Sequence, residues 1–231
     1  MTEVVNRDEL ERRLGRVIGR NQRAELQKLL DLLGNPPLIS NVPPEYWDNG
    51  WKQMAAEVEP VLMDIYLGQA QAFMGTISIG VDWDMVNKGA AEYARKYGYD
   101  LVREIFQKTE QGVTDILRAL QTEIPNFYEE GMNLGQLEAR LGRWFSPVRA
   151  EMIAITETTR AATEAERVVV DLIAQETGVG LIPIWQTEND KIVCDICDEK
   201  HNQPITDGEY PPLHVRCRCW VVYEFPKKDA A

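Results

Sequence analysis

All four cysteines of this chain lie within 26 residues, at Cys194, Cys197, Cys217 and Cys219. His214, one of only two histidines, stands three positions before Cys217. Two ligands three residues apart on a tight turn can point at one ion, and zinc takes four such ligands in a tetrahedron. The spacing therefore predicts a structural zinc site built from four of these five residues. The knuckle spacing favours Cys217 over Cys219 as the fourth ligand, and both stay candidates.

Two other interpretations of the cysteines stay open. They are four buried reduced thiols, or a disulfide pair formed after release from a reducing cytosol. Arg216 and Arg218 are expected to offset thiolate charge and donate hydrogen bonds to sulfur. His201 is interpreted as a solvated loop residue. The sequence has no H-x-E deaminase motif, no H-E-x-x-H motif and no phosphate-binding glycine loop, so we expect no enzyme.

Most of the remaining chain shows apolar residues at helical spacing. Helices are expected over residues 7–34, 45–73, 84–97 and 100–122, the first of them with an interruption near Gly19. A short helix is expected after Asn133, which is a candidate N-cap. A further helix is expected from Ser146-Pro147 to about Thr177. Residues 35–44 are expected to be a linker. Two short β-branched and aromatic runs, LIPIW and CWVVYEF, bracket the cysteines and predict strands. The predicted fold is mainly α, with a small C-terminal α+β lobe whose short antiparallel β-hairpin is closed by the Cys/His zinc site.

The acidic net charge of the chain disfavours some classes of binding partner. The formal net charge is −12, which argues against broad affinity for DNA or anionic lipid. The most apolar stretch, Val61 to Val81, contains Asp64, Gln69 and Gln71, so no membrane span is expected. The charged first residues lack an apolar signal core, so we expect synthesis in the cytosol.

Separated motifs resemble one known family. They are W-x-T-x-x-D-x-x-V-C-x-x-C (Trp185 to Cys197, with Thr187 and Asp190), P-P-x-H-x-x-C-R-C (Pro211 to Cys219), and a Ser146 to Glu157 helix containing R-A-E-x-I-A-x-T-E. With NLGQLEARLGRWF and VDWD…AAEYARKYG, they are similar to the phage head-morphogenesis family, the Mu F-like minor head proteins, over roughly residues 81–223. A glycine usual after the second cysteine is replaced by Lys200-His201-Asn202.

The resemblance implies a virion protein made in the host bacterial cytoplasm and held inside the phage head. It implies a role in head assembly, DNA packaging or DNA delivery at the portal vertex. Expected partners are portal, capsid and scaffold proteins, with packaged DNA as a further candidate and no membrane. The implied domains are an N-terminal helical arm and linker (1–40), a helical region (41–100), and a Mu F-like domain (101–231) containing the zinc lobe (181–223).

Two other functions are weighed against this one. A zinc-dependent nucleic-acid-binding module would need a basic face, yet residues 190–231 hold six Lys or Arg against eight acidic residues. An enzyme or toxin-type module would need further chain after Cys219, where 12 residues follow. Arg149, Glu151, Glu157 and Arg160 are interpreted as a solvated helix face. Their alternative role is docking against the zinc lobe.

Overall fold

The structure is a computed structural model that describes residues 3–76, 84–86, 88–89, 110–188 and 193–226. It divides into two compact units. Unit 1 comprises Met1–Arg12, Val61–Ala94 and Met152–Ala231, and unit 2 comprises Arg13–Pro60 and Arg95–Glu151. Among the described residues, no helix combines the length and apolar character needed to cross a membrane. The predicted domain boundaries stay predictions.

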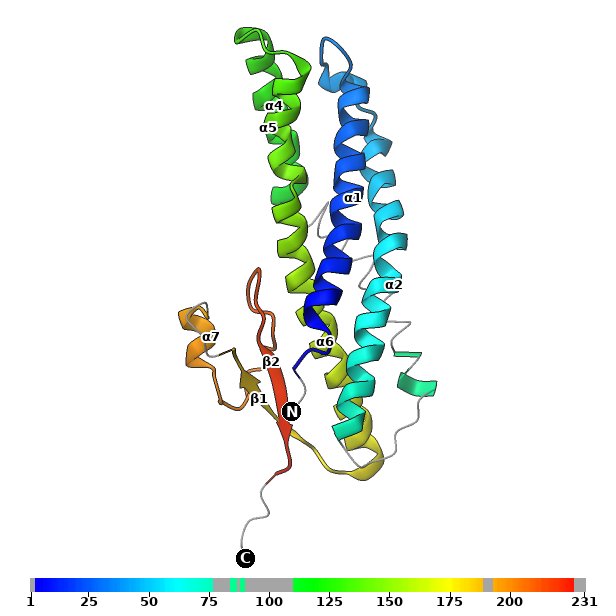
Figure 1. Ribbon diagram of the computed structural model, residues 1–231, viewed down its shortest axis with the longest axis vertical. Helices are drawn as coiled ribbons and strands as arrows, with labels where there is room; N and C mark the ends of the chain where they lie inside the picture. Colours follow the sequence, from blue (N-terminus) through cyan, green and yellow to red (C-terminus); the bar gives the residue numbers. More distant parts are fainter. Residues whose placement is uncertain (1–2, 77–83, 87, 90–109, 189–192, 227–231) are drawn as a thin grey trace, which may run out of the picture. The chain divides into compact units, whose positions relative to one another are not determined.

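Helices build unit 2 (Figure 1). α1 (Arg7–Leu33) ends at Gly34, whose φ of 77° suits a residue without a Cβ. α2 (Pro44–Thr76) and α4 (Glu110–Glu129) follow in the chain, and Tyr46 donates its hydroxyl to the Glu25 carbonyl at 2.8 Å. The core of the unit collects buried apolar residues from these helices, from α5 (Leu134–Gly142) and from the 3-10 helix η2 (Arg143–Phe145): Leu26, Leu29, Leu33, Tyr46, Ala119, Leu120, Ile124, Leu137, Leu141 and Phe145.

Capping residues set the starts of the next two helices, as the sequence predicts. Asn133 and Gln136 form a reciprocal capping box at α5 (Leu134–Gly142). Ser146 accepts the Arg149 N–H at 3.2 Å and Pro147 opens α6 (Pro147–Thr177), which stops before Gly178 at φ 71°. The sequence therefore fixes these helix boundaries locally.

Unit 1 combines the later part of α6 with a two-stranded antiparallel sheet. β1 (Ile182–Gln186) pairs with β2 (Trp220–Glu224), and Trp185 lies opposite Val221. The other edge of β1 binds the following loop, since Asn202 donates its N–H to the Trp185 carbonyl at 2.8 Å. The Phe73 and Tyr223 rings meet edge to face at 5.2 Å, which joins α2 to the sheet. The mainly helical fold with a short antiparallel hairpin is confirmed.

Other helices differ from their predicted bounds, or lie partly outside the described residues. α1 continues through Gly19, so the predicted interruption is wrong. A Cβ at Gly19 would meet the Ala150 Cβ at 3.5 Å, an ordinary van der Waals contact, so the helix continues through a position that would also accommodate an alanine. The predicted helix 84–97 is described only at 84–86 and 88–89, where it is helical, and residues 100–109 of the next lie outside the described part. The helix predicted to end near 122 continues to Glu129 through Pro125.

Candidate metal centre

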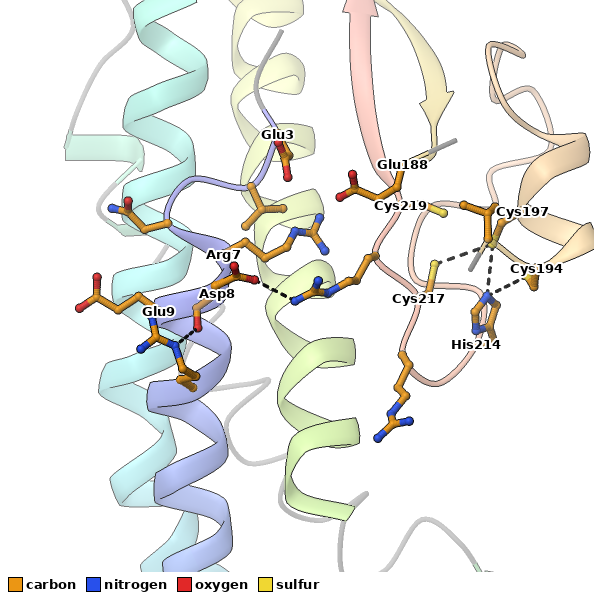
Figure 2. Close-up of a pocket in the computed structure, with 16 residues that line it drawn as sticks. Glu3, Arg7, Asp8, Glu9, Glu188, Cys194, Cys197, His214, Cys217 and Cys219 are labelled. Carbon is orange, nitrogen blue, oxygen red and sulfur yellow. Dashed lines mark hydrogen bonds and ion pairs between the residues drawn. The ribbon is translucent and has the colours of Figure 1, made fainter. Parts of the chain in front are cut away.

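The first cysteine pair lies at the start of a short helix. Cys194 is the N-cap of α7 (Asp195–Glu199), and its carbonyl accepts the N–H groups of Cys197 and Asp198 at 3.0 and 2.9 Å. This turn brings both sulfurs to one side. His214 completes the group, because its Nε2 lies 3.2 Å from the Sγ of both Cys194 and Cys197 (Figure 2). The three ligand atoms lie within 4.8 Å of one another.

Cys197 also belongs to a second group, together with Cys217 and Cys219, whose three sulfur atoms likewise lie within 4.8 Å of one another. The Cys197 and Cys217 Sγ atoms are 3.9 Å apart. In a zinc tetrahedron with Zn–S bonds of about 2.3 Å, two sulfurs lie about 3.8 Å apart and a sulfur and a nitrogen about 3.6 Å. The five residues predicted as candidate ligands therefore form one Cys/His cluster that could hold a metal ion.

The ring of His214 is oriented by its own loop. Its Nδ1 lies 2.8 Å from the Val215 carbonyl, an acceptor that places the proton on Nδ1. Nε2, the atom beside the two sulfurs, is left with its lone pair. The same hydrogen bond raises the pKa of His214, since the carbonyl acceptor stabilises the positively charged, doubly protonated ring more than the neutral ring.

The thiols differ in their electrostatic surroundings. A hydrogen bond from Cys219 lowers the pKa of Cys217 to about 5, and this contact, together with burial, raises the pKa of Cys219. A backbone hydrogen bond from Cys197 lowers the pKa of Cys194. Burial raises the pKa of Cys197 to about 12, so a cation would have to displace its proton. Cys217 is thus the more thiolate-like of the last two cysteines, and Cys219 the donor beside it.

Helix α6 holds the loop that carries Cys217. The Thr156 hydroxyl accepts the Arg216 N–H at 3.0 Å, and Arg216 lies in the left-handed region at φ 64°. One turn further on, the Thr159 hydroxyl donates to the Cys217 carbonyl at 2.8 Å. Cys217 and Cys219 precede β2 and do not lie on it, so their placement comes from these bonds and not from strand alternation. Sequence reasoning missed both threonines as supports of the site.

Arg218 and His201 take roles other than those predicted, whereas the role predicted for the Arg216 side chain stays a prediction. Arg218 donates through Nε to Glu11 at 3.2 Å and through Nη2 to Asp8 at 3.0 Å, so its charge is matched by carboxylates of α1. His201 is half-buried, and its Nδ1 accepts the Thr187 N–H at 3.1 Å. It thereby closes the end of β1, and the interpretation as a solvated loop residue is wrong. Asp190 of the same motif lies outside the described residues.

The solvated-face interpretation of α6 is also wrong where the helix packs within unit 1. Glu157 is 6% exposed and pairs with Arg160 at 2.9 Å. Its neighbours on the helix are buried polar residues as well: Thr156, Thr158, Thr159, Thr163 and Glu166. Burying polar groups is costly unless they are hydrogen-bonded, which explains why several of them bind loops and the N-terminal segment.

A cavity of about 770 Å³ adjoins the cluster within unit 1 (Figure 2). One side is formed by the residues around the start of α1, including Asn6, Arg7 and Asp8. The opposite side is formed by Glu188, the loop from His214 to Cys219, Val193 and the α7 cysteines. The cavity is therefore enclosed by the N-terminal segment on one side and by the cysteine-bearing loops on the other.

These features define a mainly helical protein whose C-terminal lobe gathers three cysteines and a histidine, with a fourth cysteine adjacent. Residues 118–222 match the family described as Phage Mu protein F like protein. The match confirms the resemblance predicted from the motifs, and these residues form the Mu F-like part of the chain. The resemblance predicted for 81–117 stays a prediction. No curated protein and no solved structure matches the chain.

Proposed function

We propose that this chain is a structural minor head protein of a phage, held inside the virion and bound to portal and capsid proteins. The match of residues 118–222 to the Mu F-like family carries this proposal. The role would lie in head assembly, DNA packaging or DNA delivery at the portal vertex, without catalysis. Its net charge of −12 favours protein contacts over wide contact with DNA.

The C-terminal lobe would be held together by zinc. Cys194, Cys197, His214 and Cys217 are the proposed ligands, because the His214 Nε2 lies 3.2 Å from the first two sulfurs and the Cys197 and Cys217 sulfurs are 3.9 Å apart, close to the distance between two zinc-bound sulfurs. Cys219 would remain a thiol that donates a hydrogen bond to the Cys217 sulfur. Four protein ligands leave no open position for substrate, so the ion would be structural. Its contribution would be to tie α7, the His214 loop and the start of β2 into one lobe.

Paired cysteine variants test the ligand set. Cys217→Ser should weaken zinc binding on the order of 100-fold, because a four-ligand site loses about a quarter of its binding free energy. Cys219→Ser should keep about one zinc per chain. Elemental analysis of the purified protein and competition with a chromogenic chelator measure both effects. The reverse pattern would replace Cys217 by Cys219 as the fourth ligand. Metal-free wild-type protein whose melting is unchanged by a chelator would remove the zinc proposal altogether.

The virion role is tested separately, by mass spectrometry of purified particles from a strain producing them. The chain should be present and should co-purify with the portal protein when the two are co-expressed. Particles that assemble with full infectivity and contain none of this chain would contradict the proposal. This result does not depend on zinc, so the two proposals can fail independently.

A further inference from the structure

Arg7, the first residue of α1, is buried with two of its three guanidinium nitrogens unpaired. The residue is 5% exposed, and its Nη1 donates to the Thr159 hydroxyl at 3.2 Å. Its Nε and Nη2 are enclosed and have no hydrogen-bond partner among the described residues. The N–H groups of these two nitrogens point in the same direction and form the fork with which arginine binds two oxygen atoms at once. A buried fork without an acceptor is costly, which indicates a missing anionic group.

The nearest carboxylate on the same helix does not fill this role. The Glu11 Oε1 lies 3.9 Å from the Arg7 Nη1, which is too far for a hydrogen bond. Both oxygens of Glu11 are instead held by Arg218, through its Nε and Nη2. Arg218 has therefore taken the acceptor that would otherwise be available to Arg7, and the Arg7 fork stays unpaired.

The fork lies in the wall of the 770 Å³ cavity. Figure 2 shows Arg7 reaching from the start of α1 toward the side of the cavity that carries Glu188 and the cysteine lobe. The first turn of α1 lines the same space, and a helix N-terminus favours a negative charge. Because Nε and Nη2 are enclosed, a ligand reaches them when the stretch 3–6, which contributes to the same wall, moves aside. An unpaired fork and a helix N-terminus thus converge on one position.

We propose that this cavity is a carboxylate-binding site in which Arg7 pairs with a single carboxylate, free or carried by an acidic side chain of a partner protein. The charge of the lining selects for a monoanion. The cavity wall carries four guanidinium groups and four carboxylates, Glu3, Asp8, Glu9 and Glu188, so its formal charges cancel. Because the Arg7 fork has no acceptor, that fork and the helix N-terminus favour one carboxylate beside them, whereas a polyanion such as DNA would also meet the carboxylates of the wall.

The test follows the Arg7 Nε–H resonance in ¹H–¹⁵N NMR spectra of the full chain. Sodium acetate is titrated against sodium chloride at constant ionic strength, and the resonance should shift saturably. The half-point should be on the order of tens of millimolar, as expected for one charge-assisted bidentate contact. A blocked pentapeptide with one glutamate between glycines that binds more tightly than acetate would place the carboxylate on a protein. Equal affinities would indicate a free carboxylate, and both results support the site. Inorganic phosphate and a DNA duplex should act more weakly.

Three variants make the assignment specific. Arg7→Lys keeps the charge but lacks the fork, so the acetate-dependent shifts of the backbone amide resonances of Asn6 and Asp8, which line the same cavity and are followed in both proteins, should be lost. Arg12→Lys, another arginine of the cavity wall, should respond like the wild type. If Glu188→Gln alone moves the Arg7 resonance as far as saturating acetate does, Glu188 is its internal partner and the proposal fails. It fails equally if only phosphate or DNA moves the resonance. It also fails if no anion does, since the fork would then hold water.

Discussion

Two adjacent threonines of α6 should respond in opposite directions to the same substitution. Thr158 and Thr159 are both fully buried. The Thr159 hydroxyl donates to the Cys217 carbonyl and accepts from Arg7 Nη1, whereas the Thr158 hydroxyl has no partner among the described residues. Thr159→Val leaves a carbonyl and a guanidinium nitrogen without their partner and should lower the free energy of unfolding by about 2–4 kcal/mol. Thr158→Val removes an unpaired buried hydroxyl and should raise it by about 1 kcal/mol.

Urea unfolding followed by far-UV circular dichroism measures both variants, with the wild type in the same buffer. The two substitutions share side-chain volume, helix position and loss of a hydroxyl, so their difference isolates the hydrogen bonds. Thr122→Val is the exposed control, since its hydroxyl bonds only to the Arg118 carbonyl one turn earlier, and its effect should stay within about 0.5 kcal/mol. Equal destabilisation by Thr158→Val and Thr159→Val would refute the idea that α6 anchors the Cys217 loop.

Two further predictions concern unit 2. Hydrogen bonds from Arg20 and then Asn21 lower the pKa of Glu57 from its ordinary value of 4.5. A lowered folded-state pKa gives stability that is present above the unfolded pKa and is lost as pH falls through the folded one. The gap in unfolding free energy between wild type and Glu57→Gln should therefore be full near pH 6 and shrink below about pH 4.5, and a gap independent of pH would contradict this. Asn133→Ala removes the capping box of α5 and should cost about 1 kcal/mol in urea unfolding, while Gln27→Ala on an exposed helix face should cost little.

The starts of α5 and α6 and the two strands could be predicted from the sequence because each depends on residues that are close together in the chain. Asn133 and Ser146-Pro147 start helices wherever the chain allows one, because their side chains and ring geometry act on neighbouring N–H groups. The strands that bracket the cysteines follow from short β-branched runs in the same way. Gly19 was misleading because one glycine inside a helix costs only about 1 kcal/mol, which the other residues of this 27-residue helix outweigh.

The Cys/His cluster could be predicted from the spacing of its residues, whereas the hydrogen bonds from α6 that hold its second loop could not. Cys194 and Cys197 meet on one turn because three positions separate them, and a pair spaced in this way is typical of metal sites, which is why the sequence predicted His214 as its partner. The bonds that hold the second half of the cluster join residues about 60 positions apart, from Thr156 and Thr159 to the Arg216–Cys217 backbone. A threonine on a helix most often bonds to its own helix or to solvent, so nothing local marks these two as donors and acceptors for a distant loop.

Helix α6 shows what a surface interpretation leaves out. The sequence predicts a solvated face with weak surface pairs at Arg149, Glu151, Glu157 and Arg160. In the fold Glu157 is buried, and so are the neighbouring Thr156 and Thr159, which bind the loop that carries Cys217. A buried hydroxyl on a helix stabilises its partner and also fixes that partner's orientation, because a hydrogen bond is strong only near its preferred geometry. Arg216 is held at φ 64°, a conformation that costs a non-glycine residue about 1 kcal/mol or more, and the Thr156 hydroxyl receives its N–H there. The helix therefore fixes the backbone on which Cys217 is presented, and an ion bound at the cluster would meet a ligand loop that is already positioned.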